Sequence, residues 1–176
     1  MKATGIVRRI DDLGRVVIPK EIRRTMRIRE GDPLEIFTDR EGGVIFKKYS
    51  PVADVATYAA DVCASLHSVA GLFCAVCDSD SVIAFSGSGK KDVLDRRISE
   101  DLGQLLENRK PYLSDSGEIA LTAEKISPAI SAAAPIISNG DLLGGIVFLQ
   151  SSDKKATDSE QKLLSAAAMF ISKQLE

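Results

Sequence analysis

The sequence has very few residues suited to nucleophilic or metal chemistry: one histidine, three cysteines and no tryptophan in 176 residues. A metal centre that needs several imidazoles cannot be assembled around His67 alone, and the sequence shows no cluster that would indicate a Ser/His/Asp triad. We interpret His67, near the end of a predicted helix, as a solvated or capping residue. No catalytic residue, metal or cofactor is therefore expected.

The chain also lacks an apolar run near the roughly 20 residues that cross a membrane. Its first residues, Met1 and Lys2, are not followed by the apolar segment of a signal peptide. We expect a cytoplasmic protein that does not interact with membranes. Its cysteines are accordingly interpreted as reduced thiols.

Two short motifs resemble chemical sites only in part. Cys74 and Cys77 have C-x-x-C spacing, but on a predicted strand they point to opposite faces, and no second cysteine pair exists. Core thiols are therefore favoured over a metal site. The segment 86–92 ends in Gly-Lys-Lys-Asp, yet Ala84 and Lys91 stand where a P-loop needs Gly and Ser or Thr. A surface turn is favoured there over an anion site.

Charge is distributed unevenly along the chain. The overall formal charge is −2, but residues 2–29 hold nine basic side chains and only three acidic ones. The basic residues of this segment are Lys2, Arg8, Arg9, Arg15, Lys20, Arg23, Arg24, Arg27 and Arg29. A small basic N-terminal region therefore precedes an acidic remainder.

The first 50 residues are predicted to form a small, mainly β domain. A turn at 11–14 separates two β-rich runs, Pro19 precedes a short helical segment, and a Gly-containing loop separates two further β-rich runs. The predicted strands are 4–10, 15–18, 33–38 and 44–48, and the predicted helix is 20–26.

This domain is too small to stabilise a core alone, and it has no cysteine or histidine for a disulfide or zinc. Its strands are apolar on both faces: Ile6 and Ile10 share a face with Arg8, and Val7 shares the other with Arg9. Strands of this kind are buried between two layers, which an intertwined dimer would supply.

The arginines of the predicted helix cluster on one side. At 100° per residue, Arg23, Arg24 and Arg27 fall within about 100° of arc, roughly opposite Ile22 and Met26. Arginine suits phosphates and guanine edges because its planar fork offers several donors. We therefore predict a nucleic acid as the partner over a merely solvated face, with Arg8, Arg9 and Arg15 joining the surface. A two-fold axis would give two equivalent contacts on the duplex.

Residues 51–176 are predicted to form an α+β domain with an antiparallel sheet flanked by helices. Apolar residues recur at helical spacing in three segments, β-rich runs form two hairpins, and Asn139-Gly140 is a hairpin turn signal. The predicted helices are 52–70, 93–108 and 158–175, with Asp158 as the last cap, and the predicted strands are 71–77, 82–86, 134–138 and 142–150. Residues 111–133 show no clear pattern and are interpreted mostly as loop.

Residues 1–49, with GRVVIPKEIRR at their centre, strongly resemble the DNA-binding domain of the AbrB family of transition-state regulators. The resemblance implies an intertwined swapped-hairpin β-barrel dimer. It also implies DNA contacts at the matching positions Arg8, Arg9, Arg15, Arg23 and Arg24. Arg27 stands where the family commonly has glycine, so Arg27 and Arg29 stay open between contact and solvated charge.

Segments 77–99 and 135–150 and the closing helix resemble the GAF-like domain of a family member that regulates forespore genes in spore-forming bacteria. This implies an activator and repressor of sporulation genes, located in the forespore cytoplasm. The apolar stripes of 52–70 and 158–175 could join two dimers into a homotetramer. A small-molecule effector stays open, with its binding residues unknown.

Two alternatives come from other classes. AbrB-type domains also occur in antitoxins, although a long folded domain replaces their disordered tail here. Some GAF-fold proteins reduce methionine sulfoxide with cysteines, but no activating cation stands beside Cys63, Cys74 or Cys77 in the sequence.

Overall fold

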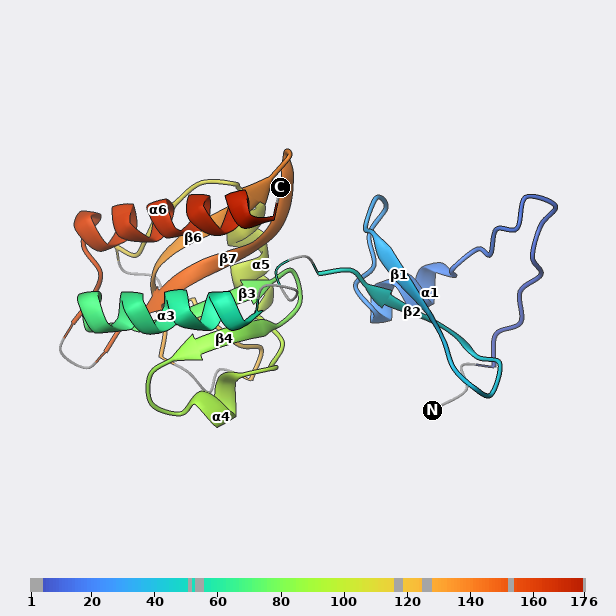
Figure 1. Ribbon diagram of the computed structural model, residues 1–176, viewed down its shortest axis with the longest axis horizontal. Coiled ribbons are helices and arrows are strands. Elements are labelled where there is room, and N and C mark those ends of the chain that lie inside the picture. Colours follow the sequence, from blue (N-terminus) through green and yellow to red (C-terminus); the bar gives the residue numbers. More distant parts are fainter. Residues whose placement is uncertain are drawn as a thin grey trace. The chain divides into compact units, whose positions relative to one another are not determined.

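The computed structural model describes residues 5–50, 52, 56–115, 119–124, 128–151 and 154–175. The chain divides into two compact units, Met1–Tyr49 and Ser50–Glu176 (Figure 1). Thr4, Val55 and residues 116–118 and 125–127, to which some predictions extend, lie outside the described residues.

The N-terminal unit contains one short helix and one hairpin. Helix α1 is Lys20–Thr25, with Pro19 as its N-cap and Met26 as its C-cap. It starts at the predicted residue and ends one residue earlier than predicted. Strands β1 (Leu34–Thr38) and β2 (Val44–Lys48) pair antiparallel, as predicted. The hairpin loop is held by Asp39, whose Oδ1 accepts hydrogen bonds from the amides of Glu41 and Gly43.

The first two predicted strands are not formed in the single chain. Residues 5–10 and 15–18 form neither a helix nor a strand, and Figure 1 shows them as a loop beyond the hairpin. The physical reason is that a strand requires a neighbour for its backbone N–H and C=O groups. Their apolar side chains are exposed as well, with Val7 at 86% and Val17 at 72%.

The C-terminal unit is built on a five-stranded antiparallel sheet in the order β4-β3-β7-β6-β5. Its strands are β3 (Phe73–Asp78), β4 (Val82–Ser86), β5 (Tyr112–Leu113), β6 (Ile130–Ser138) and β7 (Asp141–Leu149). Asn139 and Gly140, both with positive φ, make the turn between β6 and β7, as the Asn-Gly signal predicts.

Both faces of this sheet are buried (Figure 1). Helices α3 (Ala56–Ala70) and α6 (Asp158–Gln174) lie against one face, and α5 (Glu100–Glu107) contacts β6 and β7 on the other. Residues alternate between the two cores: Ile146 and Phe148 pack under α3 and α6, whereas Val147 and Leu149 pack with Leu102 and Leu106 of α5. The predicted class, an antiparallel sheet flanked by helices, is confirmed.

The single helix predicted for 93–108 is wrong, because two helices cover this range. The four-residue α4 (Lys90–Val93) ends where Leu94 turns extended, and Asp95 has a left-handed φ of 62°. Helix α5 then starts at Glu100, after its N-cap Ser99, whose hydroxyl accepts a hydrogen bond from the Leu102 amide. Leu94 and Ile98 fit the helical spacing, but Ile98 forms a β-bridge to Thr122 instead.

The loop interpretation of 111–133 is also wrong in part. Strand β5 lies within it, and β6 begins at Ile130, four residues before the predicted start. The cap of α6 is Thr157 rather than Asp158: its hydroxyl accepts from the Ser159 amide, and Glu160 Oε2 accepts from the Thr157 amide at 2.9 Å. In the described ranges, no helix has both the length and the apolar character needed to cross a bilayer.

Candidate nucleic-acid interface

The turn at residues 11–15 is organised by one carboxylate. Asp11 Oδ1 accepts hydrogen bonds from the amides of Leu13 (3.0 Å) and Arg15 (2.8 Å), and the Asp11 amide donates to the Arg15 carbonyl (3.1 Å). Asp11 Oδ2 accepts from Arg15 Nε at 2.7 Å. Gly14, at φ 76°, supplies the left-handed residue that closes the turn. The Arg15 side chain nevertheless stays 70% exposed.

These contacts also set the charge state of the turn. The Arg15 amide and then its guanidinium lower the pKa of Asp11 below its ordinary value. The carboxylate is therefore ionised at neutral pH, and it keeps both the turn and the ion pair. Sequence reasoning missed Asp11 as a functional residue, although Asp11 followed by Gly14 and Arg15 is a recognisable turn signal.

Helix α1 carries the other predicted arginines. Arg24 is exposed and Arg23 is half-buried, and the Nε of Arg23 has no hydrogen-bond partner within the described part of the chain. Ile22 is only half-buried and Met26 is 47% exposed, so the apolar edge of the helix is uncovered in a single chain. The predicted division of α1 into an apolar and a basic side is present, but its apolar side lacks a cover.

The end of α1 explains the unusual Arg27. The Ile28 amide donates to the Arg23 carbonyl (2.7 Å) and the Arg27 amide to the Arg24 carbonyl (3.3 Å), which is the pattern of a Schellman motif. Arg27 itself has φ 51°, the left-handed conformation that glycine adopts most readily. Lys48 Nζ of β2 donates to the Arg27 carbonyl at 3.2 Å and so fixes this end to the hairpin.

Arg8 and Arg9 lie on the segment 5–10, which forms neither a helix nor a strand, and both are exposed. The Arg8 side chain makes a local contact, in which Nη1 donates to the Val7 carbonyl at 3.4 Å. The single chain therefore presents three separate basic elements: this segment, the turn with Arg15, and α1.

The cysteines of the C-terminal unit are buried, and its histidine contacts a nearby backbone carbonyl. Cys74 packs under α3 and α6 and Cys77 packs on the opposite face, as predicted. Burial raises the pKa of Cys77 to about 12, and burial, with a smaller contribution from neighbouring Cys63, raises the pKa of Cys74. His67 Nδ1 lies 2.8 Å from the Leu72 carbonyl, to which it must donate, consistent with a capping role.

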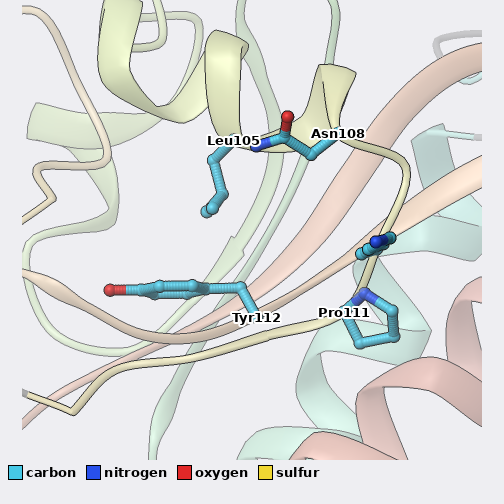
Figure 2. A pocket seen from close by; sticks show the side chains of 5 residues that line it. Leu105, Asn108, Pro111 and Tyr112 are labelled. Carbon is cyan, nitrogen blue, oxygen red and sulfur yellow. The ribbon is translucent and has the colours of Figure 1, made fainter.

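A shallow hollow lies where α5 meets β5. It has a volume of about 310 Å³ and is lined by Leu105, Asn108, Lys110, Pro111 and Tyr112. Figure 2 shows the Tyr112 ring forming one side, with Leu105 pointing toward it from the helix. The lining thus combines apolar side chains with the polar groups of Asn108 and Lys110.

Two family models match the chain. One, described as stage V sporulation protein T C-terminal, transcription factor, covers residues 54–176. The other, described as antidote-toxin recognition MazE, bacterial antitoxin, covers residues 7–54.

Curated relatives and solved structures agree with these matches. Transition state regulatory protein AbrB of Bacillus subtilis is 63% identical over 51 residues, which is 29% of this chain and 52% of that protein. A solved N-domain of the transcription factor abrB has the same identity, covers 29% of this chain and 96% of its own, and has a TM-score of 0.27. The second GAF domain of DevS from Mycobacterium smegmatis is 17% identical, covers 68% of this chain and 91% of its own, and has a TM-score of 0.54, which establishes a GAF fold.

These findings define the class: an AbrB-like N-terminal domain joined to a GAF-fold domain of a transcription-factor family. Stage V sporulation protein T of Bacillus subtilis is 47% identical over 178 residues, covering 100% of this chain and 99% of that protein. The chain belongs to the stage V sporulation protein T family.

Proposed function

We propose that this protein is a DNA-binding transcription regulator of sporulation genes, acting as activator and repressor in the forespore cytoplasm, and that it is not an enzyme. Residues 1–50 would bind double-stranded DNA. Residues 51–176 would form the contacts between dimers and bind a small-molecule effector. Family membership supports the regulatory role. The observation that carries the DNA-binding role is an exposed basic turn and helix in a unit whose apolar residues are uncovered.

In this proposal, two chains pair their residues 5–10 and 15–18 into one swapped-hairpin barrel. Pairing would join the backbones of these residues in a sheet and bury side chains such as Val7, Ile10 and Val17, which are 86%, 68% and 72% exposed in the single chain. The same pairing would gather Arg8 and Arg9 with the other basic elements. A two-fold axis then doubles the surface, so the dimer would contact two adjacent stretches of duplex.

The proposed contacts are Arg8, Arg9, Arg15, Arg23 and Arg24, binding mainly phosphates and reading DNA shape, with loose sequence preference. The test is a fluorescence titration of the full chain with a labelled duplex over a range of salt concentrations. Removing one phosphate contact should flatten the log–log slope by about 0.9, so Arg23→Ala and Arg24→Ala should each flatten it.

The matched control is Arg40→Ala, since Arg40 is an exposed arginine in the hairpin loop, outside the proposed surface. It should leave the slope close to that of the unchanged protein. If the Arg23 and Arg24 variants behave like this control, those residues do not contact DNA.

We further propose that the C-terminal units join two dimers into a homotetramer through α3 and α6, which lie side by side (Figure 1). The side chains that support this lie along these helices: Met169 is 66% exposed, Phe170 is 53% exposed, and the Phe170 ring lies 5.6 Å from that of Tyr58. The buried hydroxyl of Tyr58 has no partner among the described residues. A second pair of helices would cover these apolar side chains.

The C-terminal unit is also proposed to bind a small-molecule effector. The hollow beside Tyr112 is the candidate place, and the positive charge of Lys110 in its lining favours an anion. A thermal-shift screen of small organic acids on the full chain tests this, because a ligand that binds only the folded state raises the melting temperature with concentration. A hit that persists unchanged in Lys110→Ala would place its site elsewhere.

The antitoxin model that matches residues 7–54 supports one alternative. Against it stands the folded GAF-like unit in the place of a disordered toxin-binding tail. A toxin that binds the full chain with high affinity would favour the antitoxin role.

A further inference from the structure

We infer that Asp11 is a positioning residue for DNA recognition: it holds the Nε edge of Arg15 so that the Nη edge is presented to the duplex. The inference rests on the proposed function, because it assigns a role within the same DNA-binding surface. It concerns how Arg15 acts rather than whether DNA is bound.

The geometry gives the two oxygens of Asp11 separate tasks. Oδ1 accepts the amides of Leu13 and Arg15 and so fixes the turn. Oδ2 accepts a hydrogen bond from Arg15 Nε at 2.7 Å. The carboxylate is therefore held by the backbone before it holds the guanidinium, and the backbone and side chain of Arg15 are fixed by the same group.

The planar guanidinium can bind Asp11 and a second partner at once. It has five N–H donors in a rigid fork, and an acceptor on Nε leaves the terminal donors free for a second partner. The Arg15 side chain is 70% exposed despite its ion pair, and within the described residues its Nη atoms have no hydrogen-bond partner. Holding a long side chain in place before binding reduces the ordering cost of the complex.

Lysine cannot act in the same way. Its ammonium is a compact charge on a flexible stem, so at position 15 it would close onto Asp11 and offer no second edge at a fixed angle. If Asp11 positions Arg15, then Arg15→Lys should weaken DNA binding although the charge is kept. If Arg15 acts only as a charge, lysine should replace it.

The experiment compares arginine with lysine at position 15 in two backgrounds, the unchanged protein and Asp11→Asn, using the full chain and a short labelled duplex of mixed sequence. Asp11→Asn keeps an oxygen for the two turn amides but cannot accept from Nε, so it separates the turn from the ion pair. In the unchanged background, Arg15→Lys should raise Kd by about tenfold, as expected when a hydrogen bond to a charged group is removed. In the Asp11→Asn background, the same change should raise Kd by less than about threefold, as expected for exposed charges.

Two outcomes would overturn the inference: Arg15→Lys binding as tightly as the unchanged protein, or an equal lysine penalty in both backgrounds. Circular dichroism and the unfolding midpoint of each variant separate misfolding from a loss of positioning. Failure of the proposed function looks different, because Arg15→Ala, Arg23→Ala and Arg24→Ala would then all leave duplex binding unchanged. Weak binding by the alanine variants, with lysine fully active at position 15, would reject the role of Asp11 alone.

Discussion

Replacing Val17 by Asp should break the proposed N-terminal dimer. Val17 is 72% exposed in the single chain, and full burial of a valine side chain contributes about 1.5–3 kcal/mol. Covering the exposed part is therefore worth about 1–2 kcal/mol per chain, or about 2–4 kcal/mol per dimer. A buried, unpaired carboxylate adds a further penalty, so the dimer Kd should rise by at least about a hundredfold.

The assay is analytical ultracentrifugation of the full chain over a range of concentrations, with far-UV circular dichroism beside it. Val17→Asp should reduce the proposed tetramer to a dimer held by the C-terminal units, lose strand signal and lose DNA binding. Val17→Thr, which keeps the branched shape with less apolar surface, should be intermediate. Unchanged mass and strand content in Val17→Asp would refute the shared core, because the exposed face of this side chain has no cover in a single chain over the described residues.

Phe170→Asp on α6 should halve the mass of the assembly, because it disrupts the proposed contact between dimers. The salt dependence of DNA binding should stay the same, since the N-terminal dimers are untouched. An unchanged mass would reject the α3/α6 interface. The thiols should react slowly with Ellman's reagent in the native protein at mildly alkaline pH and rapidly after unfolding, because burial raises the pKa of Cys77 to about 12. The stability that comes from keeping this thiol neutral is present below its ordinary pKa of 9.0, and it should be lost as pH rises toward 12. A native thiol that reacts fast would reopen cysteine-dependent chemistry.

Much of the C-terminal fold follows from local pattern. Cys74 and Cys77 lie on opposite faces of the sheet because side chains alternate along a strand. The turn at Asn139-Gly140 forms because both residues readily adopt positive φ. The cap of α6 is also a local feature, since Thr157 and Glu160 have capping-box spacing, but Asp158 competes as an equally good cap residue.

Two predictions for the C-terminal unit, the helix 93–108 and the start of β6, were wrong because contacts distant in sequence override the local pattern. Leu94 and Ile98 have helical spacing, yet a left-handed Asp95 and the bridge from Ile98 to Thr122 override it. The alanines at the start of β6 carry little strand preference by themselves. They form a strand because β7 pairs along their length, with Ala133 opposite Val147 and Ala134 opposite Ile146.

The sequence by itself determined where the positive charge lies and which family patterns the chain carries, because composition and short motifs are local properties. That the N-terminal region needs a partner chain for its core stays a prediction. Only the tertiary structure decided that Asp11 ties Arg15 into a fixed turn and that Arg27 occupies a left-handed helix end. It also decided that Val7 and Val17 remain uncovered in one chain. These features depend on which backbone groups and side chains come into contact in the folded chain, and local sequence patterns alone do not determine those contacts.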